Sequence, residues 1–551
     1  MNDEYTPLCL AAKDGDIEAV RRLLAEGQDP NQVTTYDTPL NLASSGGFVE
    51  IATLLISAGA DVNRTCQYGY TALYFGAPHP EMVKLLLAAG AQVDASSLQG
   101  QAIHMAAGTS LESVKILHAA GAKLDADSFH QQPIHDAADA GKCDILEYLL
   151  QQGIRIDSRS KMVGEQAIHR AASRSHIEAI QFLLDQGAAV DARSQDIIHD
   201  GEQPIHAAAA NGTTETVAFL LSLGANIDAA DKEGNQAIHS AARSGKIDNL
   251  RFLLAHGACV DAVNANGEQP IHKAARSLET MNFLVEAGAT WEARTSNGDQ
   301  LIHFAVADGN RECIEFLLKN GAAADACNDQ GEQPIHRISS IYCSSSEERF
   351  GKQKEILDLL VAGGAKLDAS DATGHQLIHG LSTGSDSAKN ISLLTHLLDH
   401  GVRVDAATHG GTQAIHLAAM SIAIVSSVEE TKFDPLPLLL ARGADIHARN
   451  VHGLQAIHYA VHFGRYSGPL PSGRMASSKI PVLQFLIAHG ADLSSETASG
   501  ESVLELSKNP AKTEDQEATP TALTEWIESQ LPPPNLIQRL RRKFRRWWQA
   551  A

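Results

Sequence analysis

The stretch GEQPIHKAARS, residues 267–277, contains a tetrapeptide that returns along most of the chain. QPIH also begins at Gln132, Gln203 and Gln333. The variants QAIH and QLIH begin at Gln101, Gln166, Gln236, Gln300, Gln376, Gln413 and Gln455. With related starts at residues 6, 38, 71 and 502, most steps are close to about 33 residues, a period typical of stacked repeats. The period predicts one array over nearly all 551 residues.

Residues 234–262 show what one repeat encodes. Gln followed by Pro or Ala, Ile, His and two alanines predicts a short helix, since proline suits a first turn where its missing N–H needs no partner. Gly245 is expected to end this helix, and Gly257 to form the left-handed cap of a second one. The apolar residues between them share one face of that second helix: Ile247, Leu250, Leu253 and Leu254.

The period, the tetrapeptide and the ending LLxxGAxxD resemble the ankyrin repeat, whose own tetrapeptide is TPLH. The resemblance covers roughly residues 3–530. It implies a mainly α solenoid of about 15 helix-turn-helix repeats with β-hairpin fingers along one edge. It further implies a concave face that binds other proteins, without catalysis or a cofactor.

The histidine of the tetrapeptide joins neighbouring repeats in this family through hydrogen bonds to backbone. The resemblance implies that structural role for eleven residues: His104, His135, His169, His206, His239, His272, His303, His336, His379, His416 and His458. Metal binding would require several imidazoles to meet at one ion, whereas equivalent side chains in successive repeats should lie about 10 Å apart. We therefore predict no metal site.

The first three repeats keep the family's threonine, at Thr6, Thr38 and Thr71, whereas glutamine replaces it from Gln101 onward. A threonine hydroxyl caps a helix start well, and glutamine caps it poorly. We expect the glutamine amide to bond sideways to the adjacent finger instead.

Composition favours a soluble protein of a reducing compartment. The formal charge of −22 argues against the body of the protein binding nucleic acid. Seven scattered cysteines without a CxxC pair indicate a reducing compartment. The start lacks the pattern of a signal peptide, and no apolar run is long enough to span a bilayer. We expect a cytoplasmic monomer.

The motifs of common enzymes are missing from the sequence. It contains no GxxxxGK[ST] phosphate loop, no GxSxG elbow and no zinc signature. The array also leaves no room for a separate catalytic domain. We predict that the protein is not an enzyme, and an enzymatic function is kept only as a remote alternative.

From the eleventh repeat the repeats lengthen, and the additional residues are expected as polar loops between the first and second helix. They occupy residues 338–353, 381–392, 420–437, 461–481 and 509–521. These insertions are either neutral, because loops tolerate added residues, or a partner surface specific to this protein.

A carboxylate stands directly before the tetrapeptide in several repeats. The residues are Glu165, Glu202, Glu268, Asp299 and Glu332, with Glu501 equivalent in the last repeat. Two interpretations remain open and are compatible. The carboxylates either favour the positive end of the following helix, or form an acidic row that recognises a basic partner.

The C-terminal segment differs from the rest of the chain. After the array, residues 1–530, a proline linker at 531–535 precedes residues 536–551, which are expected to form an amphipathic helix. One side is apolar: Leu536, Ile537, Leu540, Phe544, Trp547 and Trp548. The other side is basic: Arg539, Arg541, Arg542, Lys543, Arg545 and Arg546.

Such a helix resembles anchors that lie on an anionic membrane surface. Helix capture by a calmodulin-like protein, nuclear import, RNA contact, a secretion signal and docking on the chain's own acidic body remain alternatives. We expect a noncatalytic scaffold or adaptor tethered to a membrane by this helix. The alternative is a secreted, host-directed effector whose tail is the targeting signal.

Overall fold

The computed structural model describes residues 5–531, except for 35–36, 67, 99, 129–130, 162–163, 196–199, 342–345, 384–389, 422–434, 462–479 and 509–521. The chain divides into an N-terminal half, residues 1–274 with 279–289, and a C-terminal half, residues 275–278 with 290–551. The predicted proline linker beyond residue 531 and the predicted tail helix at 536–551 lie outside the described residues.

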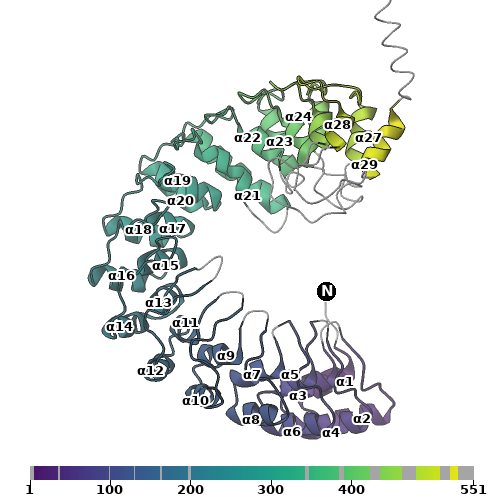
Figure 1. Ribbon diagram of the computed structural model, residues 1–551, viewed down its shortest axis with the longest axis vertical. Coiled ribbons are helices and arrows are strands. Elements are labelled where there is room, and N and C mark those ends of the chain that lie inside the picture. Colours follow the sequence, from purple (N-terminus) through teal and green to yellow (C-terminus); the bar gives the residue numbers. More distant parts are fainter. Residues whose placement is uncertain are drawn as a thin grey trace, which may run out of the picture. The chain divides into compact units, whose positions relative to one another are not determined.

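In the N-terminal half each repeat is a pair of short antiparallel helices, and Figure 1 shows first and second helices in two layers. The first helices are α1 (Pro7–Asp14), α3 (Pro39–Ser45), α5 (Ala72–Gly76), α7 (Ala102–Ala107), α9 (Pro133–Asp139), α11 (Ala167–Ser173), α13 (Pro204–Asn211), α15 (Ala237–Ser244) and α17 (Pro270–Lys273). The second helices are α2 (Ile17–Ala25), α4 (Val49–Ser57), α6 (Pro80–Ala88), α8 (Leu111–Ala119), α10 (Cys143–Gln151), α12 (Ile177–Asp185), α14 (Thr214–Ser222), α16 (Ile247–Ala255) and α18 (Leu278–Glu286).

The C-terminal half begins with the 3-10 turn η1 (Ala274–Arg276) and continues the same pairing. Its first helices are α19 (Leu301–Ala307), the 3-10 helix η2 (Pro334–Ser340), α22 (Leu377–Leu381), α24 (Ala414–Ser421), α26 (Ala456–Val461) and α28 (Val503–Lys508). Its second helices are α20 (Arg311–Lys319), α21 (Ser346–Ala362), α23 (Ile391–Asp399), α25 (Pro435–Ala441), α27 (Ile480–Ala488) and α29 (Ala522–Gln530). The mainly α repeat architecture expected from the sequence is confirmed.

The core lies between the two layers of each repeat. In the repeat at 234–262, Ile238, Ala241, Leu250 and Leu253 are at most 1% exposed. The small alanines let consecutive first helices pack closely, while the leucines of the second helix fill the space behind them. Gly245 and Gly257 have positive φ angles of 70° and 98°, so both helices end where the sequence predicts.

The fingers are simpler than the predicted β-hairpins. Among the described residues they contain isolated antiparallel bridges, such as Ala230 with Gln236, and no strand. Neighbouring fingers are joined by single backbone hydrogen bonds, for example from the Ala265 N–H to the Glu233 carbonyl over 2.7 Å. Gly234 lies beside this hydrogen bond with a φ of 81°, and a Cβ there would lie 2.7 Å from the Ala265 nitrogen. Only glycine allows the next finger this close.

The first insertion differs from its prediction. Residues 346–353 were expected in a polar loop, but they belong to α21, which is 17 residues long where second helices are typically nine. Arg349 and Gln353 of this helix are 2% and 0% exposed. Arg349 Nη2 donates to the Ser339 carbonyl over 2.9 Å and Gln353 Nε2 to the Ile338 carbonyl over 3.0 Å. The helix extends because these polar side chains satisfy carbonyls at the end of η2.

The capping of the first helices changes along the chain. In the first three repeats the hydroxyls of Thr6, Thr38 and Thr71 accept from the backbone N–H three residues later, over 3.1 to 3.3 Å. In the eleven repeats with glutamine, the histidine Nδ1 accepts from the glutamine backbone N–H over 2.9 to 3.2 Å. In some of these repeats the glutamine amide reaches the finger before it, as from Gln101 Nε2 to the Asp94 carbonyl over 3.1 Å and from Gln455 Nε2 to the His447 carbonyl over 3.2 Å.

The other ring nitrogen, Nε2, reaches the backbone between the second helix of its repeat and the next tetrapeptide. For ten of the eleven histidines it lies 2.9 to 3.3 Å from a backbone oxygen. The acceptors are the carbonyls of Ala126, Glu165, Glu202, Asn235, Glu268, Glu332, Ala369, Ala406, Ala448 and Ser495. Because Nδ1 accepts a hydrogen bond, Nε2 must carry the proton and donate. One neutral imidazole thus joins a helix start to the connection that leads into the following repeat, and we call this contact the histidine joint.

We predict that replacing His239 by Ala destabilises the array by about 2 to 4 kcal/mol, because it leaves the N–H of Gln236 without its partner, removes one hydrogen bond to the Glu268 carbonyl and creates a cavity. Thermal unfolding followed by circular dichroism measures the effect. His256→Ala, at an exposed position of the same repeat, is the matched control. Equal midpoints for both variants would contradict the role of the joint.

Acidification should weaken the array between pH 6.5 and pH 4. Burial lowers the pKa of His135, His169, His239 and His379 to about 4, from 6.5 in the unfolded chain. Below pH 6.5 the unfolded chain therefore binds more protons, and stability falls by up to about 1.4 kcal/mol per pH unit for each such histidine. Urea unfolding at pH 7.5 and pH 5.5 checks this, and an unchanged or higher midpoint at pH 5.5 would refute it.

Candidate partner-binding face

The residue directly after each tetrapeptide lies on the first helix of its repeat and is exposed or half-buried in most repeats. We call these residues the surface row. Along the chain they are Leu10, Leu42, Phe75, Met105, Asp136, Arg170, Ala207, Ser240, Lys273, Phe304, Arg337, Gly380, Leu417 and Tyr459. Along the chain the surface row changes from apolar to charged residues and back, whereas the histidine joints beside it consist of the same residue types and hydrogen bonds in each repeat.

The predicted acidic row lies next to the surface row and is largely paired with it. Glu165 lies 3.2 Å from Arg170, Glu268 lies 2.5 Å from Lys273, and in each case the cation is five residues after the acid. This spacing places the residue before the helix beside the residue after the histidine. Glu202 differs, because its nearest cation is Arg243 of the next repeat at 3.7 Å.

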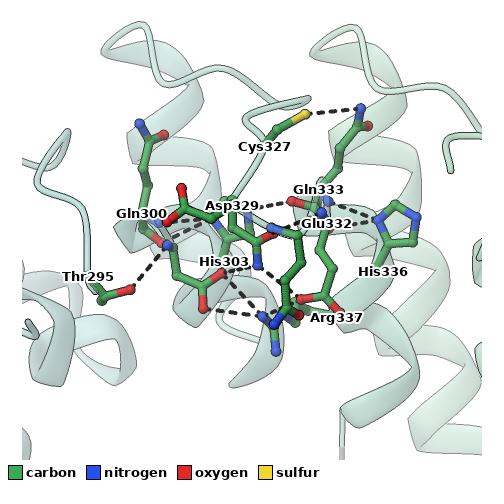
Figure 2. Close-up of polar contacts among 12 residues, drawn as sticks. Thr295, Gln300, His303, Cys327, Asp329, Glu332, Gln333, His336 and Arg337 are labelled. Carbon is green, nitrogen blue, oxygen red and sulfur yellow. Dashed lines mark hydrogen bonds and ion pairs between the residues drawn. The ribbon is translucent and has the colours of Figure 1, made fainter. Parts of the chain in front are cut away.

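At Arg337 one cation serves two repeats. Its Nη2 donates to Glu332 over 2.7 Å and to Asp299 of the preceding repeat over 3.2 Å. Figure 2 shows Arg337 directed toward Glu332, whereas His336 turns toward the backbone of Gln333. The ion pairs and the histidine joint therefore occupy adjacent positions without competing for the same groups.

The carboxylates of these pairs are less exposed than the cations. Side-chain exposures are 16% for Glu165 against 25% for Arg170, and 13% for Glu268 against 21% for Lys273. Burial opposes ionisation of Glu268, but hydrogen bonds from Lys273 and Asn264 outweigh it, so the pKa of this carboxyl lies below its ordinary value. A molecule approaching this face meets an ion pair with its cation outward.

Polar finger residues hydrogen-bond to these carboxylates, and they were not predicted from the sequence. Asn264 Oδ1 accepts from the Glu268 backbone N–H, while its Nδ2 donates to Asn235 over 2.9 Å and to the Glu268 carboxylate over 2.7 Å. Asn328 does the same between Asp299 and Glu332. In the sequence, Ser160, Asn264, Thr295 and Asn328 stand four or five residues before Glu165, Glu268, Asp299 and Glu332. These residues fix the finger and hold the carboxylate in place.

The remaining predictions concern metal sites, membrane spans and the tail. Among the residues that the structure describes, no group of three or more His, Cys, Asp or Glu could hold a metal ion. Within the same ranges no helix is long and apolar enough to cross a membrane. The tail set Leu536, Ile537, Arg539, Leu540, Arg541, Arg542, Lys543, Phe544, Arg545, Arg546, Trp547 and Trp548 lies outside them.

Comparison with known proteins agrees with this architecture. A model of three-copy ankyrin repeats matches residues 8–97, 79–160, 157–231 and 205–295, and one of many-copy ankyrin repeats matches 275–318 and 302–340. The crystal structure of the human ASB11 ankyrin repeat domain is 25% identical, with a TM-score of 0.29 over 46% of this chain and 99% of that one. No curated protein matches the chain. Since the family matches run without a gap from residue 8 to residue 340, more than half of the chain, the protein belongs to the ankyrin repeat family.

Proposed function

We propose that the protein is a noncatalytic, cytoplasmic scaffold or adaptor that binds a protein partner through its surface row and fingers. The observation behind this is the contrast between constant joints and a variable row. Gln, Ile and His recur because the helix starts and the repeat contacts need them, whereas the residue after histidine contributes little to either and differs from repeat to repeat. A fixed frame with variable exposed side chains suits recognition of another surface.

The acidic row takes part in this proposal as a set of ion pairs. Glu165, Glu268 and Glu332 each hold a cation of the surface row at 2.5 to 3.2 Å. A basic partner would first have to displace Arg170, Lys273 or Arg337, which costs much of the energy it gains. We therefore propose that this middle part of the row selects a partner with both acidic and basic groups.

A second part of the proposal is a tether to an anionic membrane. Residues 536–551 contain six basic residues, no acidic residue and two adjacent tryptophans. Each basic residue near an anionic surface contributes on the order of 1 kcal/mol, and the apolar side chains add burial at the headgroup boundary. The support for the tether is the sequence of this segment.

Replacing Phe304 by Ala should weaken partner capture several-fold, because this ring belongs to the surface row, and should lower the melting midpoint no more than Phe252→Ala does, since both rings are half-buried. Crosslinking pull-down with the full-length protein measures capture. Phe252→Ala is the matched control, since this half-buried phenylalanine lies on the second helix α16. If both variants lose capture equally, the partner does not bind through the surface row.

The membrane tether makes a separate prediction. Full-length protein should sediment with vesicles that contain phosphatidylserine, and the triple substitution Phe544→Ala, Trp547→Ala and Trp548→Ala should abolish this because it removes the apolar side of the segment. Vesicles of phosphatidylcholine alone are the control for charge. Equal sedimentation of the triple variant and the unaltered protein would rule the tether out.

A further inference from the structure

The first four repeats have an apolar residue at every position of the surface row. Leu10, Leu42, Phe75 and Met105 lie on α1, α3, α5 and α7, which pack side by side in one layer (Figure 1). Leu10 is 43% exposed, and the other three residues are half-buried. We call these four residues the apolar stripe. Contiguous apolar residues on the surface of a protein are typical of an interaction site.

Exposed apolar side chains on the fingers widen this surface. Eight large apolar side chains are exposed among the described residues, and half of them lie within the first 98 residues: Leu10, Val33, Tyr68 and Leu98. Tyr68 and Leu98, on neighbouring fingers, are 48% and 58% exposed. The Leu98 N–H donates to the Tyr68 carbonyl over 3.1 Å, which holds the two fingers together. The exposed apolar side chains are therefore concentrated in the first repeats.

Aromatic rings connect the finger of the third repeat to the apolar stripe. Between ring centroids, Tyr70 lies 6.4 Å from Tyr68 and 5.5 Å from Phe75. The ring of Tyr74 lies 5.8 Å from that of Phe75. The apolar stripe and the exposed finger side chains therefore belong to one surface. Tyrosines beside aliphatic side chains are typical of binding hot spots.

The first helices of this surface carry almost no charge. The helices α3, α5 and α7 contain no Asp, Glu, Lys or Arg, and α1 contains only Lys13 and Asp14, at its C-terminal end. A charged side chain placed against Leu42, Phe75 or Met105 would lose its hydration without meeting an opposite charge. The face of a partner that covers the apolar stripe must therefore be uncharged and apolar.

The spacing of the apolar stripe matches an α-helix laid along it. Equivalent side chains of successive repeats lie about 10 Å apart, as packed helices do. Seven residues of an α-helix rise about 10.5 Å and make almost two turns, so residues seven apart share one face. In an extended strand, residues three apart also span about 10 Å, but their side chains point to opposite faces. A helix can therefore present one apolar residue to each repeat, whereas a strand cannot.

We propose that the apolar stripe, with Tyr68 and Leu98, binds an amphipathic α-helix of a protein partner whose apolar residues recur every seven positions. This inference rests on the partner-binding role proposed above and deepens it by naming the chemistry of the partner at the first four repeats. A helix of about 20 residues is about 30 Å long and covers all four repeats. Its apolar face contacts the apolar stripe and the fingers, and its polar face remains in solvent.

Fluorescence anisotropy with a designed peptide and the full-length protein tests the proposal. The labelled probe consists of three heptads, with leucine at the first and fourth position of each and alanine with equal numbers of glutamate and lysine elsewhere. Its control has the same composition in scrambled order, so its leucines do not share a helix face. We expect the leucine-heptad peptide to bind about tenfold more tightly than the scrambled peptide.

Substitutions on the fingers locate the binding site. The double substitution Tyr68→Ser and Leu98→Ser should weaken binding of the leucine-heptad peptide about tenfold, with an unchanged melting midpoint because both side chains are exposed. Val451→Ser, at a 63% exposed finger position of the C-terminal half, is the matched control and should leave the affinity unchanged.

The proposal is overturned if the leucine-heptad peptide binds no more tightly than the scrambled one, or if the double variant binds it as tightly as the unaltered protein. Tighter binding of a proline-rich peptide with leucine at every third position would also overturn it, because a polyproline helix, with a repeat of about 9.3 Å, would then be the occupant. The titration needs no natural partner, and the pull-down with Phe304→Ala concerns the C-terminal half. Helix binding at the apolar stripe and partner capture through the surface row therefore fail separately.

Discussion

The array depends on one contact that is repeated eleven times at the helix starts. A neutral imidazole accepts from the backbone N–H of the glutamine three residues earlier and, in ten described cases, donates to a carbonyl between the second helix and the next tetrapeptide. A buried backbone group without a partner costs about 1 to 3 kcal/mol, and the imidazole removes this cost at the glutamine N–H. The carbonyl it reaches can have a second donor, as the Glu268 carbonyl has in the Asn264 N–H. Because a repeat contacts only its neighbours, stability is built from these local joints together with the packing of alanines and leucines.

Much of this could be predicted from the sequence because it is periodic. The positions of the helix pairs, the caps at Gly245 and Gly257 and the ankyrin architecture follow from patterns that recur in register. The departures come from interactions that a single repeat does not reveal. Residues 346–353 read as a polar loop, yet Arg349 and Gln353 turn inward to carbonyls of η2 and extend the helix. The fingers contain only single bridges among the described residues, and bonds such as that from the Ala265 N–H to the Glu233 carbonyl join neighbouring fingers.

The candidate site was only partly predictable for a similar reason. The sequence marks the carboxylates before the tetrapeptide, but the partner of each depends on which side chain the fold brings beside it. Glu165 and Glu268 meet the cation five residues later, whereas Glu202 meets Arg243 of the following repeat. A row that appears acidic in sequence is thus a series of ion pairs. The surface-row residues of the first four repeats, Leu10, Leu42, Phe75 and Met105, are far apart in the sequence and become neighbours only because their helices pack side by side. The same frame therefore presents different chemistry in different repeats.

The central claim is that the repeated histidines are neutral and carry their proton on Nε2. Long-range ¹H–¹⁵N correlation spectra of protein labelled at histidine distinguish the two neutral tautomers and the imidazolium ion. The account predicts the Nε2–H tautomer at pH 6.5 for the histidines of the joints. Joint histidines found as imidazolium, or protonated on Nδ1, would contradict it, because neither form can accept the hydrogen bond at the helix start.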